Sequence, residues 1–83
     1  VTGRMKASAE MLMGMSVGSS YLGTVDGYNS YKKHYNVILL NGVTAVIPEN
    51  NVMMGRSLKV GDQVNVKVNA VLETHIIGSA IRI

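Results

Sequence analysis

The stretch that decides the fold is Lys59-Val60-Gly61-Asp62-Gln63-Val64-Asn65-Val66-Lys67-Val68-Asn69-Ala70. After the turn at residues 59–62, side chains alternate with a period of two. The apolar set is Val64, Val66, Val68 and Ala70, and the polar set is Gln63, Asn65, Lys67 and Asn69. This pattern is typical of a β-strand that buries one face and exposes the other to water.

Four more extended segments are predicted around this strand, at residues 21–25, 34–40, 43–47 and 76–83. The Asp26-Gly27 pair is expected to end the first of them, because Asp-Gly is a strong turn signal. Asn41-Gly42, between two apolar runs, predicts a hairpin. Pro48 cannot donate to a ladder and should stop the third strand. Residues 49–58 read as an irregular or single-turn helical crossover.

Three meander strands, a crossover and a hairpin pair predict an all-β fold, a small five-stranded OB-type Greek-key barrel with a short N-terminal arm or helix. An SH3-like barrel is the main structural alternative. The expected division is an arm over residues 1–19 and a barrel over residues 20–83. Within the arm, Ser8 is a plausible N-cap and Met11 and Met15 share a helix face.

Composition narrows the classes of protein that remain. The 83 residues are 47% hydrophobic and 16% charged, which argues against disorder. With no cysteine, neither a disulfide framework nor a thiolate zinc site is available. No apolar run approaches the ~18 residues of a membrane span. The net charge of +3 is compatible with binding of a polyanion but is weak evidence for it. A cytoplasmic or virion-associated protein is expected.

Catalytic and metal-binding patterns are missing from the sequence. His34 and His75 are the two histidines, and neither has a carboxylate or thiolate at ligand spacing. The five acidic residues are scattered, and there is no Gly-x-Ser-x-Gly element or phosphate loop. We therefore expect a binding protein that uses no metal or cofactor, not an enzyme.

Residues 17–83 resemble the RNA-binding domain repeated in ribosomal protein S-one. Gly23-Thr24-Val25 is similar to the Gly-x-Val that opens this domain, and residues 37–48 resemble its second and third strands. The segment from Leu58 to Val68, with its Val-Gly-Asp centre, is similar to the family's fourth strand, and residues 77–82 to its closing strand.

The resemblance implies binding of single-stranded RNA, with aromatic rings stacking on bases and basic side chains contacting phosphates. The segment Tyr28-Asn29-Ser30-Tyr31-Lys32-Lys33-His34-Tyr35 supplies both kinds of side chain. Tyr31 and Tyr35 are nearest to the family's two aromatic positions, although Lys32-Lys33-His34 replaces the usual glycine between them. The predicted nucleic-acid-binding set is Tyr28, Tyr31, Lys32, Lys33, His34, Tyr35 and Lys67.

Two alternatives stay open from sequence alone. If Val37 points into the barrel, alternation places Tyr35 in the core and His34 outside. Lysines in the loop and on the wet face of residues 63–70 are often merely solubilising. The second alternative for function is a structural or protein-interaction barrel, a subunit of a larger protein assembly. In it a Met-rich arm with Met11, Leu12 and Met15 contacts a partner, since Met adapts to irregular surfaces.

Overall fold

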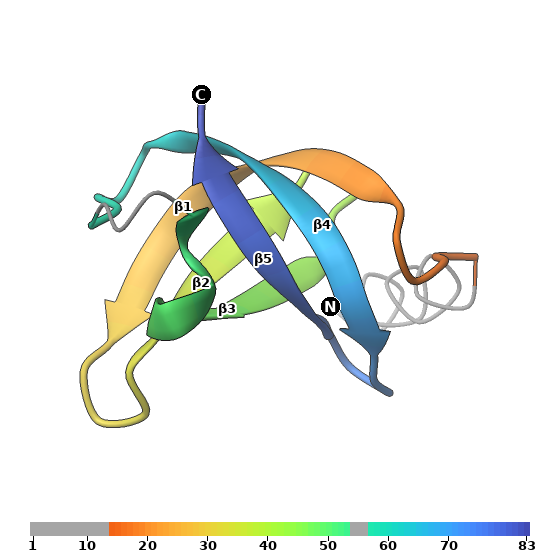
Figure 1. Ribbon diagram of the computed structural model, residues 1–83, viewed down its shortest axis with the longest axis horizontal. Coiled ribbons are helices and arrows are strands. Elements are labelled where there is room, and N and C mark those ends of the chain that lie inside the picture. Colours follow the sequence, from red (N-terminus) through yellow and green to blue (C-terminus); the bar gives the residue numbers. More distant parts are fainter. Residues whose placement is uncertain (1–13, 54–56) are drawn as a thin grey trace.

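The computed structural model describes residues 14–53 and 57–83. The strands are β1 (Ser20–Asn29), β2 (His34–Leu39), β3 (Thr44–Pro48), β4 (Gln63–Val71) and β5 (Ile76–Arg82). A single-turn 3-10 helix, η1 (Glu49–Asn51), follows β3 directly. The strands form a closed barrel in the order β1-β2-β3-β5-β4 (Figure 1). This confirms the predicted OB-type barrel.

The pairing of β3 with β5 is parallel, whereas all other named pairs are antiparallel. A parallel pair needs a crossover connection, and the segment that starts with η1 begins that connection. Val52, just after η1, forms a further parallel bridge to Ala80. The start of the crossover predicted at residues 49–58 therefore pairs with β5 beyond the last β3–β5 pair, and helps to close the barrel there.

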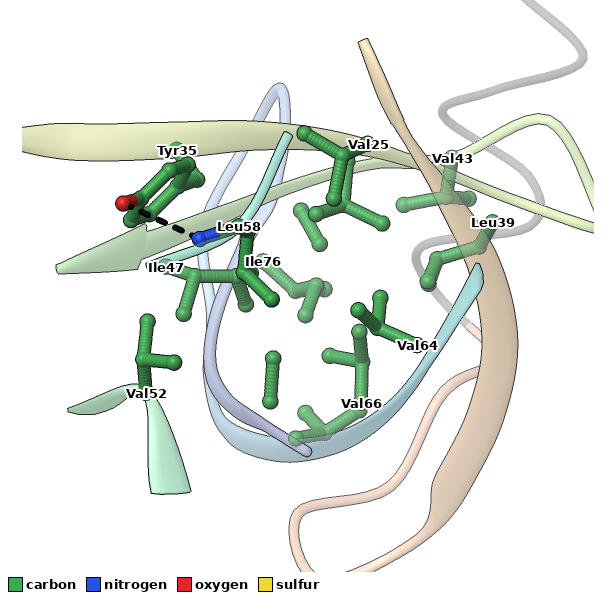
Figure 2. Packing of buried hydrophobic residues seen from close by; sticks show 14 of the residues in the cluster. Val25, Tyr35, Leu39, Val43, Ile47, Val52, Leu58, Val64, Val66 and Ile76 are labelled. Carbon is green, nitrogen blue, oxygen red and sulfur yellow. Dashed lines mark hydrogen bonds between the residues drawn. The ribbon is translucent and has the colours of Figure 1, made fainter. Parts of the chain in front are cut away.

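Alternation fills the interior with aliphatic side chains. On β4, Val64, Val66 and Val68 are fully buried while Gln63, Asn65, Lys67 and Asn69 are exposed, as predicted. The register shifts between Val68 and Ala70, which leaves Ala70 half-buried at this bulge. Figure 2 shows how side chains from all five strands meet in one core. Its fully buried large members are Leu39, Ile47, Ile76, Val25, Val37, Val43, Val64, Val66 and Val68.

The predicted Asp26-Gly27 turn is wrong. β1 is ten residues long and runs without interruption through this pair. Val25 is opposite Val37 and Gly27 is opposite Asn36, so Asp26 is the extra residue of a β-bulge. The first half of β1 pairs with β4 and the second half with β2. A strand shared in this way must bend around the barrel, and a bulge supplies that bend.

The other two turn predictions are confirmed. Gly42 has φ +87°, and the Asn41 Oδ1 accepts a bond of 3.1 Å from the Val43 backbone N–H. In the turn before β4, the Asp62 carboxylate accepts a 2.9 Å bond from the Lys59 backbone N–H, and Gly61 has φ +94°. Glycine occupies both left-handed positions because it has no Cβ to clash there.

Met15 packs into the barrel's own core and is 8% exposed. The following residues attach to β4, with the Gly18 N–H donating to the Val68 carbonyl at 2.8 Å. Met15 is therefore not available to a partner protein, contrary to the partner-binding alternative. Met11 and Leu12 lie outside the described residues, as does most of the predicted helix, so the division at residue 19 stays a prediction. No helix in the described part of the chain is long and apolar enough to cross a membrane.

Gly78 on β5 should be intolerant of any side chain. A Cβ there would collide with the Lys67 carbonyl oxygen and approach the Val66 Cγ1 to 2.9 Å. We expect Gly78→Ala to lower the free energy of unfolding by about 1–3 kcal/mol, the usual cost of overpacking. Gly27→Ala is the matched control, since a Cβ at that strand position meets nothing within 4 Å. Urea unfolding followed by circular dichroism measures both, and equal midpoints for the two variants would contradict the expectation.

Candidate nucleic-acid interface

The loop between β1 and β2 presents the most exposed aromatic ring among the described residues. Tyr31 is 92% exposed at its tip, and Lys32 and Lys33 follow it, both exposed. The Asn29 Oδ1 accepts bonds of 3.0 Å from the backbone N–H groups of both Tyr31 and Lys32. This loop (residues 30–33) therefore holds a ring and two ammonium groups on a backbone that is already ordered.

Lys33 has a left-handed backbone, with φ +58°. Its N–H donates to the Asn29 carbonyl at 2.7 Å, and its carbonyl accepts from the Glu49 N–H at 3.0 Å. A left-handed conformation is unfavourable for a residue with a Cβ, by about 1–2 kcal/mol. The neighbouring hydrogen bonds maintain this strain, which is a pattern found at binding loops.

Tyr28 and Tyr35 face each other across β1 and β2. Their ring centroids are 4.7 Å apart and the planes are tilted by 50°, an arrangement favoured by aromatic pairs. Tyr35 is 8% exposed, whereas Tyr28 remains 43% exposed. Of the two rings, Tyr28 is the one that a ligand can reach.

Tyr35 is a core residue, so its predicted role as a stacking platform is wrong. Val37 points inward, and alternation therefore brings Tyr35 inward too. Its Oη accepts a 3.3 Å bond from the Leu58 backbone N–H (Figure 2). A buried tyrosine commonly satisfies its hydroxyl in this way, and the bond fixes the end of the crossover against β2.

The outer face of β2 and β3 continues from the loop. Cross-strand register sets His34 beside Pro48, Asn36 beside Val46, and Ile38 beside Thr44. His34 is half-buried, and its Nδ1 is buried without a hydrogen-bond partner among the described residues. These six positions carry no Asp, Glu, Lys or Arg, so a contact between a ligand and one of these charged side chains must come from the surrounding loops.

Lys67 lies away from the loop. It is opposite Ser20 at the start of β1, whereas Tyr28 is eight residues further along that strand. At about 3.3 Å per residue, the two positions are up to about 26 Å apart along β1. The structure therefore does not bring Lys67, on the exposed face of β4, together with Tyr28 and the loop lysines.

Glu49 is the site residue that sequence reasoning missed. Its Oε1 accepts a 2.8 Å bond from the Tyr28 hydroxyl, although the two residues are 21 apart in sequence. Glu49 lies next to the loop because the β3–η1 junction places its backbone beside Lys33. No local sequence pattern predicts this position. The hydrogen bond to Glu49, followed by partial desolvation and the nearby negative charge, raises the pKa of Tyr28 above its ordinary value.

The β4–β5 turn (residues 72–75) lies on the opposite side of β2 and β3 from the β1–β2 loop (Figure 1). In OB barrels, the strand 2–3 face and these two loops form the usual oligonucleotide surface. His75 lies beside Thr44, because the next residues along the two parallel strands, Ile76 and Ala45, are paired. No group of three or more potential metal ligands occurs within residues 14–53 and 57–83.

We expect the Tyr28 phenol to titrate above 10.0 in the folded protein, because ionisation breaks its bond to the Glu49 carboxylate and sets two negative charges together. A pKa raised on folding means that the protonated phenol stabilises the fold at neutral pH, and that this contribution is lost as pH rises through the raised pKa. Glu49→Ala should move the pKa back toward 10.0. Carbon-13 NMR of ζ-labelled tyrosine measures both, and an unchanged Tyr28 titration in the variant would contradict the assignment.

Comparison with solved structures supports this type of barrel. GSP13 from Bacillus subtilis superposes with a TM-score of 0.67 at 32% identity, covering 78% of this chain and 55% of GSP13. An uncharacterized protein from Methanocaldococcus jannaschii gives 0.68 at 20% identity, covering 78% of this chain and 90% of its own. A candidate exosome-complex RNA-binding protein gives 0.64 at 20% identity, covering 82% and 47%.

The identity to the last two proteins is low enough that they show the fold alone. This chain spans about half the length of GSP13. The sequence matches no known protein family profile. No curated protein matches it either. The comparisons therefore establish a shared barrel.

Proposed function

We propose that this chain is a non-catalytic module that binds single-stranded RNA, of the ribosomal protein S-one type. The observation that carries the proposal is the ordered β1–β2 loop, which presents Tyr31 and two lysines beside the exposed ring of Tyr28. Unpaired bases expose faces that a duplex hides, and stacking on a ring is worth about 1–3 kcal/mol per base.

The proposed surface is the β1–β2 loop with Tyr28, whose ring lies on the same side of the hairpin as Tyr35. Tyr28 and Tyr31 provide stacking faces, and Lys32 and Lys33 provide phosphate contacts. His34 and Asn36 lie on the outer side of β2, opposite to Tyr35, where an RNA strand that passes over the loop would meet them. Among solved structures of this fold, one is described as a candidate RNA-binding protein of the exosome complex, which is in keeping with the proposal.

Single strands fit this surface better than a duplex does. Its charge contacts are two lysines in one loop, and the adjoining face of β2 and β3 carries no Asp, Glu, Lys or Arg. A duplex is held chiefly by many phosphate contacts, whereas stacking requires bases that are free to turn outward. The described cations outside the loop are Lys59, Lys67 and Arg82, and Arg82 already lies 3.9 Å from the Asp62 carboxylate.

A second candidate function, a protein-interaction barrel, is favoured by one observation. Leu22, Ile38 and Leu40 form an apolar stripe on the outer side of β1 and β2, and they are 48%, 37% and 80% exposed. The Leu40 N–H donates to the Leu22 carbonyl, so the two residues are cross-strand neighbours. Contiguous exposed apolar side chains are typical of interaction sites.

The RNA proposal predicts binding of labelled oligo-U that weakens with added salt, by about 0.7 logarithmic units per phosphate contact and per tenfold change in salt. Lys33→Gly should lower the affinity and reduce this slope by about 0.7. It should also stabilise the fold by about 0.5–1 kcal/mol, because glycine relieves the left-handed strain. Lys67→Ala, on β4 opposite the start of β1, is the control.

Fluorescence anisotropy at two ionic strengths measures the affinities. The proposal fails if no binding tighter than about 100 μM occurs at low salt. The loop assignment fails if Lys67→Ala weakens binding as much as Lys33→Gly does. A gain in stability without any loss of affinity in Lys33→Gly would remove the phosphate role of this lysine.

The interaction alternative predicts a defined oligomer in size-exclusion chromatography with light scattering. Leu40→Gln should dissociate it, because the substitution removes the most exposed side chain of the stripe. Val60→Gln, at an exposed apolar position on the turn before β4, should leave the oligomer intact. A monomer at every concentration would count against association of this chain with itself.

A further inference from the structure

The Glu49 carboxylate occupies a place that disfavours a polyanion. It lies beside the proposed phosphate-binding loop, since its backbone N–H donates to the Lys33 carbonyl at 3.0 Å. It is exposed, and it accepts the Tyr28 hydroxyl at 2.8 Å. Because the Glu49 backbone adjoins that of Lys33, the negative charge of Glu49 offsets part of the attraction of the loop lysines for phosphate. We propose that Glu49 selects the base that stacks on Tyr28 and favours guanine, an inference that rests on the proposed RNA-binding function.

The position of the carboxylate is fixed from both ends. The Lys33 carbonyl holds the backbone of Glu49, and the Tyr28 hydroxyl holds its side chain. Packing of Tyr28 on the buried Tyr35 in turn fixes the ring. A base that stacks on the open side of Tyr28 therefore meets an acceptor whose place is set before binding, and preorganised contacts lose little entropy when the complex forms.

The carboxylate has acceptor capacity left for a ligand. An ionised carboxylate offers about four lone-pair sites, and the Tyr28 hydroxyl uses one of them. Among the described residues, Glu49 forms no salt bridge with a lysine or arginine. The remaining lone pairs face solvent at the edge of the exposed ring.

Base chemistry decides which nucleotide this acceptor prefers. On its Watson–Crick edge, guanine presents two adjacent donors, N1–H and the 2-amino group, which match the two oxygens of a carboxylate. Uracil presents one N3–H between two carbonyl oxygens, which a carboxylate repels. Hydrogen bonds to a charged acceptor are stronger than neutral ones. Edges of this kind are read in single-stranded RNA, where the base is free to turn outward.

The test uses pentaribonucleotides that differ at the central base only: UUGUU, UUIUU, in which inosine lacks the 2-amino group, and UUUUU. With the unmodified protein at constant ionic strength, we expect guanine to bind about tenfold more tightly than uracil, with inosine between them. Equal affinities for all three oligonucleotides would overturn the inference and leave the proposed function standing. No binding of any of them would overturn both.

Glu49→Gln separates base selection from a purely structural role. The glutamine carbonyl oxygen can still accept the Tyr28 hydroxyl, so the ring keeps its position, while its amide N–H₂ opposes the guanine donors. We expect loss of the guanine preference together with a rise of about twofold in UUUUU affinity, because a repelling charge is gone. Glu73→Gln, at an exposed acid in the β4–β5 turn, should retain the preference. A preference that persists in Glu49→Gln, or disappears equally in Glu73→Gln, would overturn the inference.

Discussion

The ring of Tyr35 joins the core of the barrel to its candidate binding surface. One side of this side chain belongs to the core, and its hydroxyl holds the Leu58 backbone at the end of the crossover. The ring also supports Tyr28, which in turn is bonded to Glu49. Because close packing fixes Tyr35, the positions of Tyr28 and of the Glu49 side chain are defined as well.

This chain of contacts explains why the loop can be ordered without being buried. Residues 30–33 bury little, so their position must come from hydrogen bonds: two to the Asn29 side chain and one from Glu49 to the Lys33 carbonyl. Together they outweigh the unfavourable backbone of Lys33, since a net hydrogen bond contributes about 0.5–1.5 kcal/mol and left-handed strain opposes it by about 1–2 kcal/mol. Ordering the loop before binding reduces the entropy lost with the ligand.

Sequence patterns predicted the elements whose signals are local. The alternation at Val64, Val66 and Val68, and the turns at Gly42 and Gly61, depend on neighbours within a few residues, and all of these features are present. The turn predicted at Asp26-Gly27 is wrong because the residue types that favour turns also occur at β-bulges. The pairing of β1 with β2, which continues on both sides of Asp26, distinguishes the two.

The candidate site was harder to predict because its geometry is not local. The sequence does not separate Lys67 from the loop lysines, whereas the strand register sets it opposite Ser20. Alternation alone leaves the face of Tyr35 open, and the inward direction of Val37 in the barrel decides it. Glu49 contacts Tyr28 because the β3–η1 junction places it there, and neither its residue type nor its spacing from Tyr28 predicts this contact.

Magnitudes indicate what kind of binding this surface can support. Two exposed rings stacking on bases contribute about 2–6 kcal/mol, while a dissociation constant of 1 μM requires about 8 kcal/mol. Two lysines next to a carboxylate add only a modest electrostatic contribution at physiological salt, where screening acts over about 8 Å. Recognition by one such barrel is therefore expected to be weak and dominated by stacking. In that regime, one hydrogen-bonding group at the edge of a ring changes base preference without needing to dominate the affinity.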